Sequence, residues 1–207
     1  MKFRPTLLLS CIFLLSCSRY VRYAKCTFQQ ATKYHDSLKV ARQFIRSSYV
    51  YDQLNTVALF DILWLSRTVR MSYIDLYAHH WNLPQDTVKN LKEQAEQDLQ
   101  KVMVFYLLLA PDSDENIISI NNTFSRWSVI LQINDKKYYP RDMRLEDKLT
   151  PEYKAIFGNL DSIHKRVYLV TFDAYDELHQ PLINEKTQSF TLLLQATTYA
   201  TSVCWNL

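Results

Sequence analysis

Residues 66–100 read SRTVRMSYIDLYAHHWNLPQDTVKNLKEQAEQDLQ, and this stretch predicts two helices joined by a short turn. Ser66 can cap the first helix, over 67–81, because its side chain can accept a hydrogen bond from a first-turn amide. Pro84 suits the first position of the second helix, which runs to about Gln100, because its missing N–H is not needed there. Apolar positions recur at helical spacing: Val69, Tyr73, Leu76, Tyr77 and His80 or Trp81 in the first helix, and Val88, Leu91, Ala95 and Leu99 in the second. Two helices with so short a link form a helical hairpin.

Strands are predicted on both sides of this hairpin. Residues 49–65 form an apolar run that a strand or a buried helix could hold, and we predict a strand because Ser66 begins a helix directly after it. Residues 102–109 are rich in Val, Phe, Tyr and Leu and end at a turn, Ala110-Pro111-Asp112. Further strands are predicted at 126–133, 136–139, 165–172, 189–196 and 200–205, with a hairpin turn at Asn134-Asp135. Two more helices are predicted: an amphipathic helix at 32–46, and a short helix that begins at a Thr150 cap and ends at Gly158. This order predicts an α+β fold: an antiparallel β-sandwich with an inserted helical hairpin and an N-terminal helix.

The first seventeen residues predict an export leader. Lys2 and Arg4 precede an apolar run at 7–15, which stops at Leu14-Leu15-Ser16-Cys17. The stretch 5–16 holds only twelve residues, whereas a bilayer span needs roughly 20 apolar residues. We therefore predict a signal peptide at 1–16, a tether at 17–31 and one α+β body at 32–207.

Leu14-Leu15-Ser16-Cys17 resembles the lipobox of bacterial lipoproteins. The resemblance implies that the leader is removed before Cys17, that the Cys17 sulfur receives a diacylglyceryl group, and that the new amino terminus is also acylated. A second match, Leu8-Leu9-Ser10-Cys11, would leave only three leucines as the apolar segment, fewer than the ~7–15 apolar residues of an export leader. Acyl chains on Cys17 would tie the protein to a membrane, because each buried methylene contributes about 0.8 kcal/mol. Ser18 in place of Asp implies, by the sorting rule of enterobacterial lipoproteins, the periplasmic face of the outer membrane.

The predicted body also has a resemblance. Its order of elements, with Trp127-Ser-Val-Ile-Leu, Tyr139-Pro140 and Val203-Cys204-Trp205, is similar to uncharacterised bacterial envelope lipoproteins that combine a sandwich with a helical pair. The likeness covers roughly residues 49–205. No activity is implied by it.

Composition argues against several classes of function. Lys2 and Arg4 leave with the leader, so 22 cations face 21 anions and the formal charge falls from +3 to +1. Such a body lacks the basic stripe of a nucleic-acid-binding protein. Gly158 is the sole glycine of the chain, while phosphate-binding loops, dinucleotide fingerprints and nucleophile elbows all require glycine. We expect no nucleic-acid partner, no cofactor and no enzymatic activity.

Three sets of side chains could nevertheless carry chemistry. Cys26 and Cys204, the cysteines left after acylation of Cys17, could form a disulfide or remain two thiols, with Cys204 as a buried strand residue. Asp75 and His79 have the i, i+4 spacing of metal ligands, but two ligands do not make a site, so we expect no metal. Asp61 stands inside an apolar run, and three alternatives stay open for it: a functional acid, a position at a sheet edge, or hydrogen bonds from neighbouring backbone amides.

Together these features predict a membrane-anchored lipoprotein of the bacterial cell envelope that works as a non-enzymatic binding or structural module. Two alternatives stay open. A subunit of an envelope complex would dock through the helical hairpin and would expose an apolar patch there. A cryptic hydrolase would need a polar pocket near Asp61, Asp75 or His79.

Overall fold

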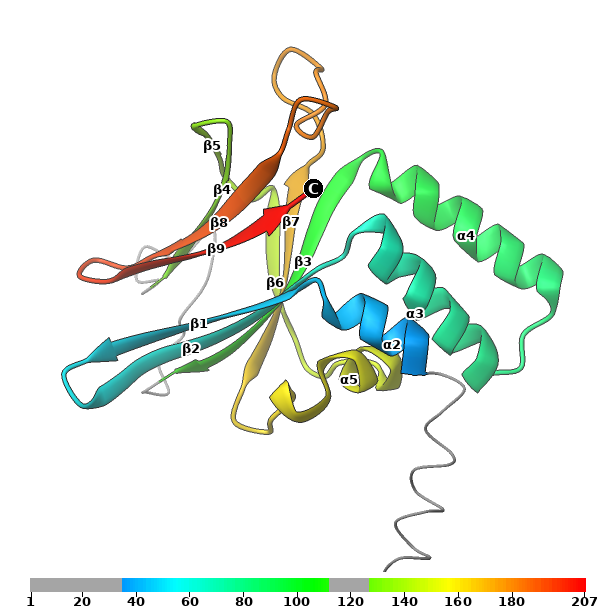
Figure 1. The fold of residues 1–207 in the computed structure, drawn as a ribbon, viewed down its shortest axis with the longest axis horizontal. Helices are drawn as coiled ribbons and strands as arrows, with labels where there is room; N and C mark the ends of the chain where they lie inside the picture. The colour runs from blue at the N-terminus through cyan, green and yellow to red at the C-terminus, as the bar shows by residue number, and fades with distance from the viewer. Residues whose placement is uncertain (1–34, 112–126) are drawn as a thin grey trace, which may run out of the picture. The chain divides into compact units, whose positions relative to one another are not determined.

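The computed structural model of the chain describes residues 35–111 and 127–207, and its fold is α+β (Figure 1). The helical hairpin consists of α3 (Arg67–His80) and α4 (Gln85–Leu99), as the sequence predicted. The other elements, in chain order, are α2 (His35–Arg42), β1 (Ile45–Asp52), β2 (Asn55–Trp64), β3 (Val102–Pro111), β4 (Ser128–Ile133), β5 (Lys136–Tyr138), β6 (Asp142–Glu146), α5 (Pro151–Phe157), the 3-10 turn η1 (Gly158–Leu160), β7 (Arg166–Asp173), β8 (Ser189–Gln195) and β9 (Ala200–Asn206).

Two antiparallel sheets pack face to face and confirm the predicted sandwich. The five-stranded sheet has the order β1-β2-β3-β7-β6, and the four-stranded sheet has the order β5-β4-β8-β9. Alternate side chains of both sheets enter one buried cluster, in which Phe60 meets Trp127 at a centroid distance of 4.9 Å. Phe190 stacks on Trp205 at 5.2 Å in the same cluster. Aromatic pairs of this kind contribute about 0.5–1.5 kcal/mol beyond the burial of their surface.

The opposite face of the five-stranded sheet packs against helices. A second buried cluster lies on this face. It joins residues of the sheet to residues of three helices, among them Leu63 and Leu108 of the sheet, Ala41 of α2, Val69 of α3 and Ile156 of α5. The five-stranded sheet is therefore covered on both faces. Among the helices of the described segments, α4 differs from α3 and α5, because none of its residues is fully buried.

The ends of two other predicted elements were wrong. The N-terminal helix was predicted over 32–46, but it ends at Arg42, and Ile45 already begins β1. The single strand predicted over 49–65 is a hairpin, in which Asp52 pairs with Asn55 across a two-residue turn. Gln53 takes a positive φ of 55° in that turn, a conformation for which glycine is the usual signal.

The remaining predicted elements are present, with ends shifted by one or two residues. Thr150 caps α5, Gly158 ends it, and Asn134 and Asp135 form the predicted hairpin turn with φ values of 48° and 66°. Pro84 is the cap of α4 and not its first helical residue. Strand β6 was not predicted, because it is a short, charged strand at the edge of its sheet. No helix in the described segments is long and apolar enough to cross a membrane.

Candidate functional site

An apolar cavity of about 380 Å³ lies between the helical hairpin and the helix-covered face of the five-stranded sheet. We call it the hairpin groove. Leu65 precedes α3 and borders the groove, and β3, β7 and α5 also contribute to its wall. Its apolar wall includes Leu65, Ile74, Leu91, Ala95, Val104 and Leu169.

The groove exists because α4 lies beside α3 instead of over the sheet. In Figure 1 the two helices run side by side, and α4 lies farther from α2 and α5 than α3 does. Two ion pairs hold α4 to α3: Arg67 Nε lies 2.6 Å from Glu96 Oε1, and Lys92 Nζ lies 2.8 Å from Asp75 Oδ1. Leu91 and Ala95, from the apolar stripe predicted for α4, therefore border the groove and are only half-buried.

Arg70 and Asp98 bring opposite charges to this groove. Arg70 Nε donates to the carbonyl oxygen of Leu65 at 3.2 Å. Burial lowers the pKa of Arg70, and the nearby Tyr153 and Asp98 oppose that shift, so the guanidinium remains a cation. Both residues belong to the described segments, and no ion pair joins them. The groove thus presents one cation and one anion that do not neutralise each other by direct contact.

Three tyrosines form the polar part of the groove wall. Tyr153 stacks on Tyr73 at a centroid distance of 4.4 Å and contacts Tyr106 at 4.6 Å. Burial raises the pKa of Tyr106 to about 12, and burial also raises the pKa of Tyr153. Burial also raises the pKa of Tyr73. All three phenols are therefore neutral at physiological pH and retain a hydroxyl hydrogen to donate.

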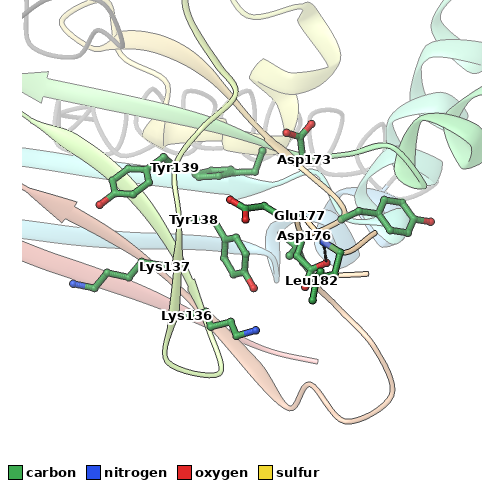
Figure 2. A pocket seen from close by; sticks show the side chains of 11 residues that line it. Lys136, Lys137, Tyr138, Tyr139, Asp173, Asp176, Glu177 and Leu182 are labelled. Atoms are coloured by element: carbon green, nitrogen blue, oxygen red, sulfur yellow. Dashed lines mark hydrogen bonds between the residues drawn. The ribbon is translucent and has the colours of Figure 1, made fainter. Parts of the chain in front are cut away.

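A second cavity, of about 360 Å³, lies between β5 and the segment that follows β7 (Figure 2). We call it the tyrosine pocket, because Tyr138, Tyr139 and Tyr175 line it. Lys136 and Lys137 also line it from β5. Its carboxylates, Asp173, Asp176 and Glu177, come from the end of β7 and the segment after it.

Structural contacts occupy two of the carboxylates in the tyrosine pocket. Asp176 Oδ1 accepts hydrogen bonds from the amides of Leu178 and Gln180 at 2.9 and 2.8 Å, which fixes the turn after β7. Asp173 Oδ1 lies 3.3 Å from Arg141 Nη1. Two of the three carboxylates of this pocket therefore serve the local fold.

Asp61 lies on β2, which is flanked by β1 and β3, so it is not at a sheet edge. Its side chain is buried, Lys165 Nζ donates to Oδ2, and Ser47 Oγ donates to Oδ1 at 2.5 Å. Lys165 Nζ also donates to the carbonyl oxygen of Leu160 at 2.8 Å. Asp61 is thus one half of a buried ion pair. The predicted hydrogen bonds from backbone amides to Asp61 are not found among the described residues.

The histidines of α3 lie among ordinary polar contacts. Asp75, which shares the i, i+4 spacing of metal ligands with His79, forms an ion pair with Lys92 through its carboxylate. His80 Nδ1 lies 3.0 Å from Glu152 Oε1. Over the described residues, no group of three His, Cys, Asp or Glu side chains is placed to hold a metal ion. Asp61, Asp75 and His79 line neither the hairpin groove nor the tyrosine pocket.

The cysteine predictions fall partly outside the described residues. Cys17 and Cys26 belong to residues 1–34, so the acyl anchor and the Cys26–Cys204 disulfide remain predictions. One prediction placed Cys204 as a buried strand residue, and it was wrong: Cys204 lies on β9 but is exposed. The reason is strand alternation: Val203 and Trp205 face the core, so Cys204 between them points outward.

Comparison with known proteins adds no relative: no family model matches the chain, and no curated protein matches its sequence.

The groove residues Arg70, Asp98, Tyr106 and Tyr153 were missed by the sequence analysis, because they converge from four separate elements. One local signal was available. Arg70 lies one turn before Ile74, so a cation shares a helix face with an apolar side chain.

Proposed function

We propose that this protein is a non-enzymatic binding module of the bacterial cell envelope, tethered to a membrane by acyl groups on Cys17, and that it binds an apolar ligand in the hairpin groove. The leader and Leu14-Leu15-Ser16-Cys17 support the tether. The groove supports the binding role. One observation carries it: Leu91 and Ala95, the middle of the apolar stripe of α4, border the groove instead of a packed core, and α4 has no fully buried residue.

The physical argument rests on exposed apolar surface. Leu91 and Ala95 of α4 and Val102 and Leu169 of the sheet are each only half-buried where they border the groove. A ligand that removed this surface from water would gain roughly 25 cal/mol per Å² of apolar area. Small-molecule sites are mostly apolar cavities of roughly 300–1,000 Å³ with a few polar groups, and the groove fits that description.

A docking surface for a partner protein is less well supported. Trp81, at the end of α3, is 60% exposed and stacks on His80 at 5.0 Å. It is the one large apolar side chain among the described residues of the hairpin that is exposed to this degree. A single exposed tryptophan is smaller than the apolar patches that mark protein interfaces.

The tether is tested by intact-mass analysis and membrane fractionation of the full-length protein from its native host. Wild-type protein should lack residues 1–16, carry lipid mass and sediment with membranes. Cys17→Ser should carry no lipid, whereas Cys11→Ser, the matched control, should behave as wild type. Wild-type protein that retains its first sixteen residues, or is freely soluble without lipid mass, would contradict the tether.

The binding role is tested with a photoreactive, uncharged long-chain alcohol added to vesicles that hold the full-length protein. Peptides from α3, α4 and β3 should be labelled in a saturable manner, as read by mass spectrometry. Ala95→Trp should fill the groove and reduce this labelling about tenfold, the effect of losing roughly 1.4 kcal/mol of binding free energy. Gln97→Trp, on an exposed position of the same helix, is the matched control. Equal labelling of both variants would contradict the role of the groove.

A further inference from the structure

We infer that the hairpin groove binds a single-chain amphiphile with a zwitterionic head group, of the lysophosphatidylethanolamine type: the head group lies between Arg70 and Asp98, and the acyl chain lies along the apolar wall. This inference rests on the proposed function and assigns a chemical class to its ligand.

The two charges lie near the same end of the groove. Arg70 is in the first turn of α3 and Asp98 is in the last turn of α4. In an antiparallel hairpin these two ends are neighbours, and the Arg67–Glu96 ion pair confirms that they lie side by side. The head group of a bound amphiphile therefore has one defined place.

Charge complementarity selects a head group of both signs. Arg70 uses Nε for the Leu65 carbonyl, and its other nitrogens are available for a phosphate, with which arginine forms paired hydrogen bonds. Asp98 can accept from an ammonium group. A purely anionic head group would place its charge near Asp98, and a purely cationic one would place its charge near Arg70. Juxtaposed like charges are unfavourable, so a zwitterion suits this pair best.

The apolar wall suits one acyl chain. Ile74, Leu91 and Ala95 border the groove from the two helices, and Val104 and Leu169 border it from the sheet. The volume of about 380 Å³ equals that of roughly a dozen water molecules at about 30 Å³ each. This volume suits one acyl chain better than the two chains of a bilayer phospholipid.

The tyrosines complete the match to such a ligand. Between a phosphate and an acyl chain, a lysophospholipid carries ester and hydroxyl oxygens. Tyr106 and Tyr153 remain protonated, so their hydroxyls can donate to these oxygens. The polar part of the wall thus offers donors for the linker and the charged pair for the head group.

The test uses full-length protein in phosphatidylglycerol vesicles and three probes that share one photoreactive hydrocarbon chain: lysophosphatidylethanolamine, a fatty acid and a long-chain amine. The lysophospholipid should reach half-maximal labelling of the groove at a concentration about tenfold lower than the other two, as expected for one added charge-assisted hydrogen bond. Asp98→Asn should remove its advantage over the fatty acid. Arg70→Gln should remove its advantage over the amine. Gln97→Trp should preserve both preferences.

The outcomes separate the inference from the proposed function. If the uncharged alcohol and all three charged probes label the groove equally well, the groove binds apolar chains and the head-group assignment is wrong. If the fatty acid binds best and Asp98→Asn has no effect, the ligand is an anionic amphiphile and the zwitterion is excluded. If no probe labels the groove, the proposed function itself fails. Urea unfolding of each variant checks that it folds, and the comparison of probes on wild-type protein needs no variant.

Discussion

A single buried carboxylate shows how strongly one residue can depend on its partner. Asp61 is 1% exposed, and the side chain of Lys165, its partner, is 12% exposed. Removing two charges from water is costly, and their mutual attraction offsets that cost only when both are present. The pair is therefore expected to specify how β2 and the start of β7 fit together, more than to add net stability.

Replacing Asp61 alone should destabilise the protein. Asp61→Asn leaves the Lys165 ammonium buried without its counter-charge, so the free energy of unfolding should fall by roughly 3–5 kcal/mol. Urea unfolding followed by tryptophan fluorescence measures this loss. Asp75→Asn is the matched control, because Asp75 is 49% exposed in its pair with Lys92 and should cost less than about 1 kcal/mol. Similar losses of unfolding free energy in the two variants would show that burial does not make the Asp61–Lys165 pair more sensitive to the loss of one partner.

The groove tyrosines should make the protein sensitive to alkali. The pKa of Tyr106 is raised from its usual value of 10.0 to about 12, so the unfolded chain loses this proton at a lower pH than the folded protein does. The resulting stability is fully present below pH 10 and is lost as the pH rises towards 12, with a slope of up to about 1.4 kcal/mol per pH unit for one group.

Comparison of urea unfolding at pH 9 and pH 11 measures that dependence. Tyr106→Phe should reduce the loss of stability between the two pH values, because it removes one group that titrates differently in the two states. Tyr49→Phe is the control, since Tyr49 is 53% exposed. If both variants keep the full alkaline loss, the Tyr106 hydroxyl is not protected by the fold.

At the scale of the element, the end of α5 depends on the one glycine of the chain. Gly158 adopts φ 58° and ψ −125°, a conformation that is open to glycine and strained for other residues. A Cβ added there would also lie 3.0 Å from Arg42 Nη2. That guanidinium donates to the carbonyl oxygens of Ala155 and Ile156, which ties α2 to the last turn of α5.

Gly158→Ala should therefore lower the free energy of unfolding by about 1–3 kcal/mol, the usual cost of a strained backbone conformation. Thermal unfolding measures the effect. Asn159→Ala, at the exposed neighbouring position, should change stability by less than about 0.5 kcal/mol. A Gly158→Ala protein as stable as wild type would mean that the turn can relax into an ordinary conformation.

The elements also show which parts of the fold were readable in the sequence. The hairpin helices, the Thr150 cap and the Gly158 stop have local signals, because caps and helical periodicity act within a few residues. The β1–β2 turn at Gln53 has no such signal, since neither Gly nor Asn marks its positive φ. Strand β6 and the hairpin groove depend on partners distant in sequence, so the one local signal, Arg70 one turn before Ile74, could not reveal the groove as a whole.

At the scale of the whole molecule, the edge strands of the two sheets are linked by side chains. Ser48 of β1 shares a hydrogen bond with Thr201 of β9, and Arg46 Nε donates to the carbonyl oxygen of Cys204 at 2.9 Å. Trp205 Nε1 donates to the carbonyl oxygen of Phe44 at 2.8 Å. The last strand of the chain is thereby held against residues that directly follow α2.

This arrangement bears on the predicted disulfide, because Cys204 is exposed next to an early part of the chain. Cys26 lies nine positions before His35, where α2 begins, and nine extended residue steps can reach about 30 Å. A bond between Cys26 and Cys204 would restrain the unfolded chain by about 4–5 kcal/mol on the loop-entropy model. We expect thiol titration of denatured, unreduced protein to find both cysteines oxidised, and reduction to lower the free energy of unfolding. Cys204→Ser should release one thiol, that of Cys26, whereas two titratable thiols in wild-type protein would rule the bond out.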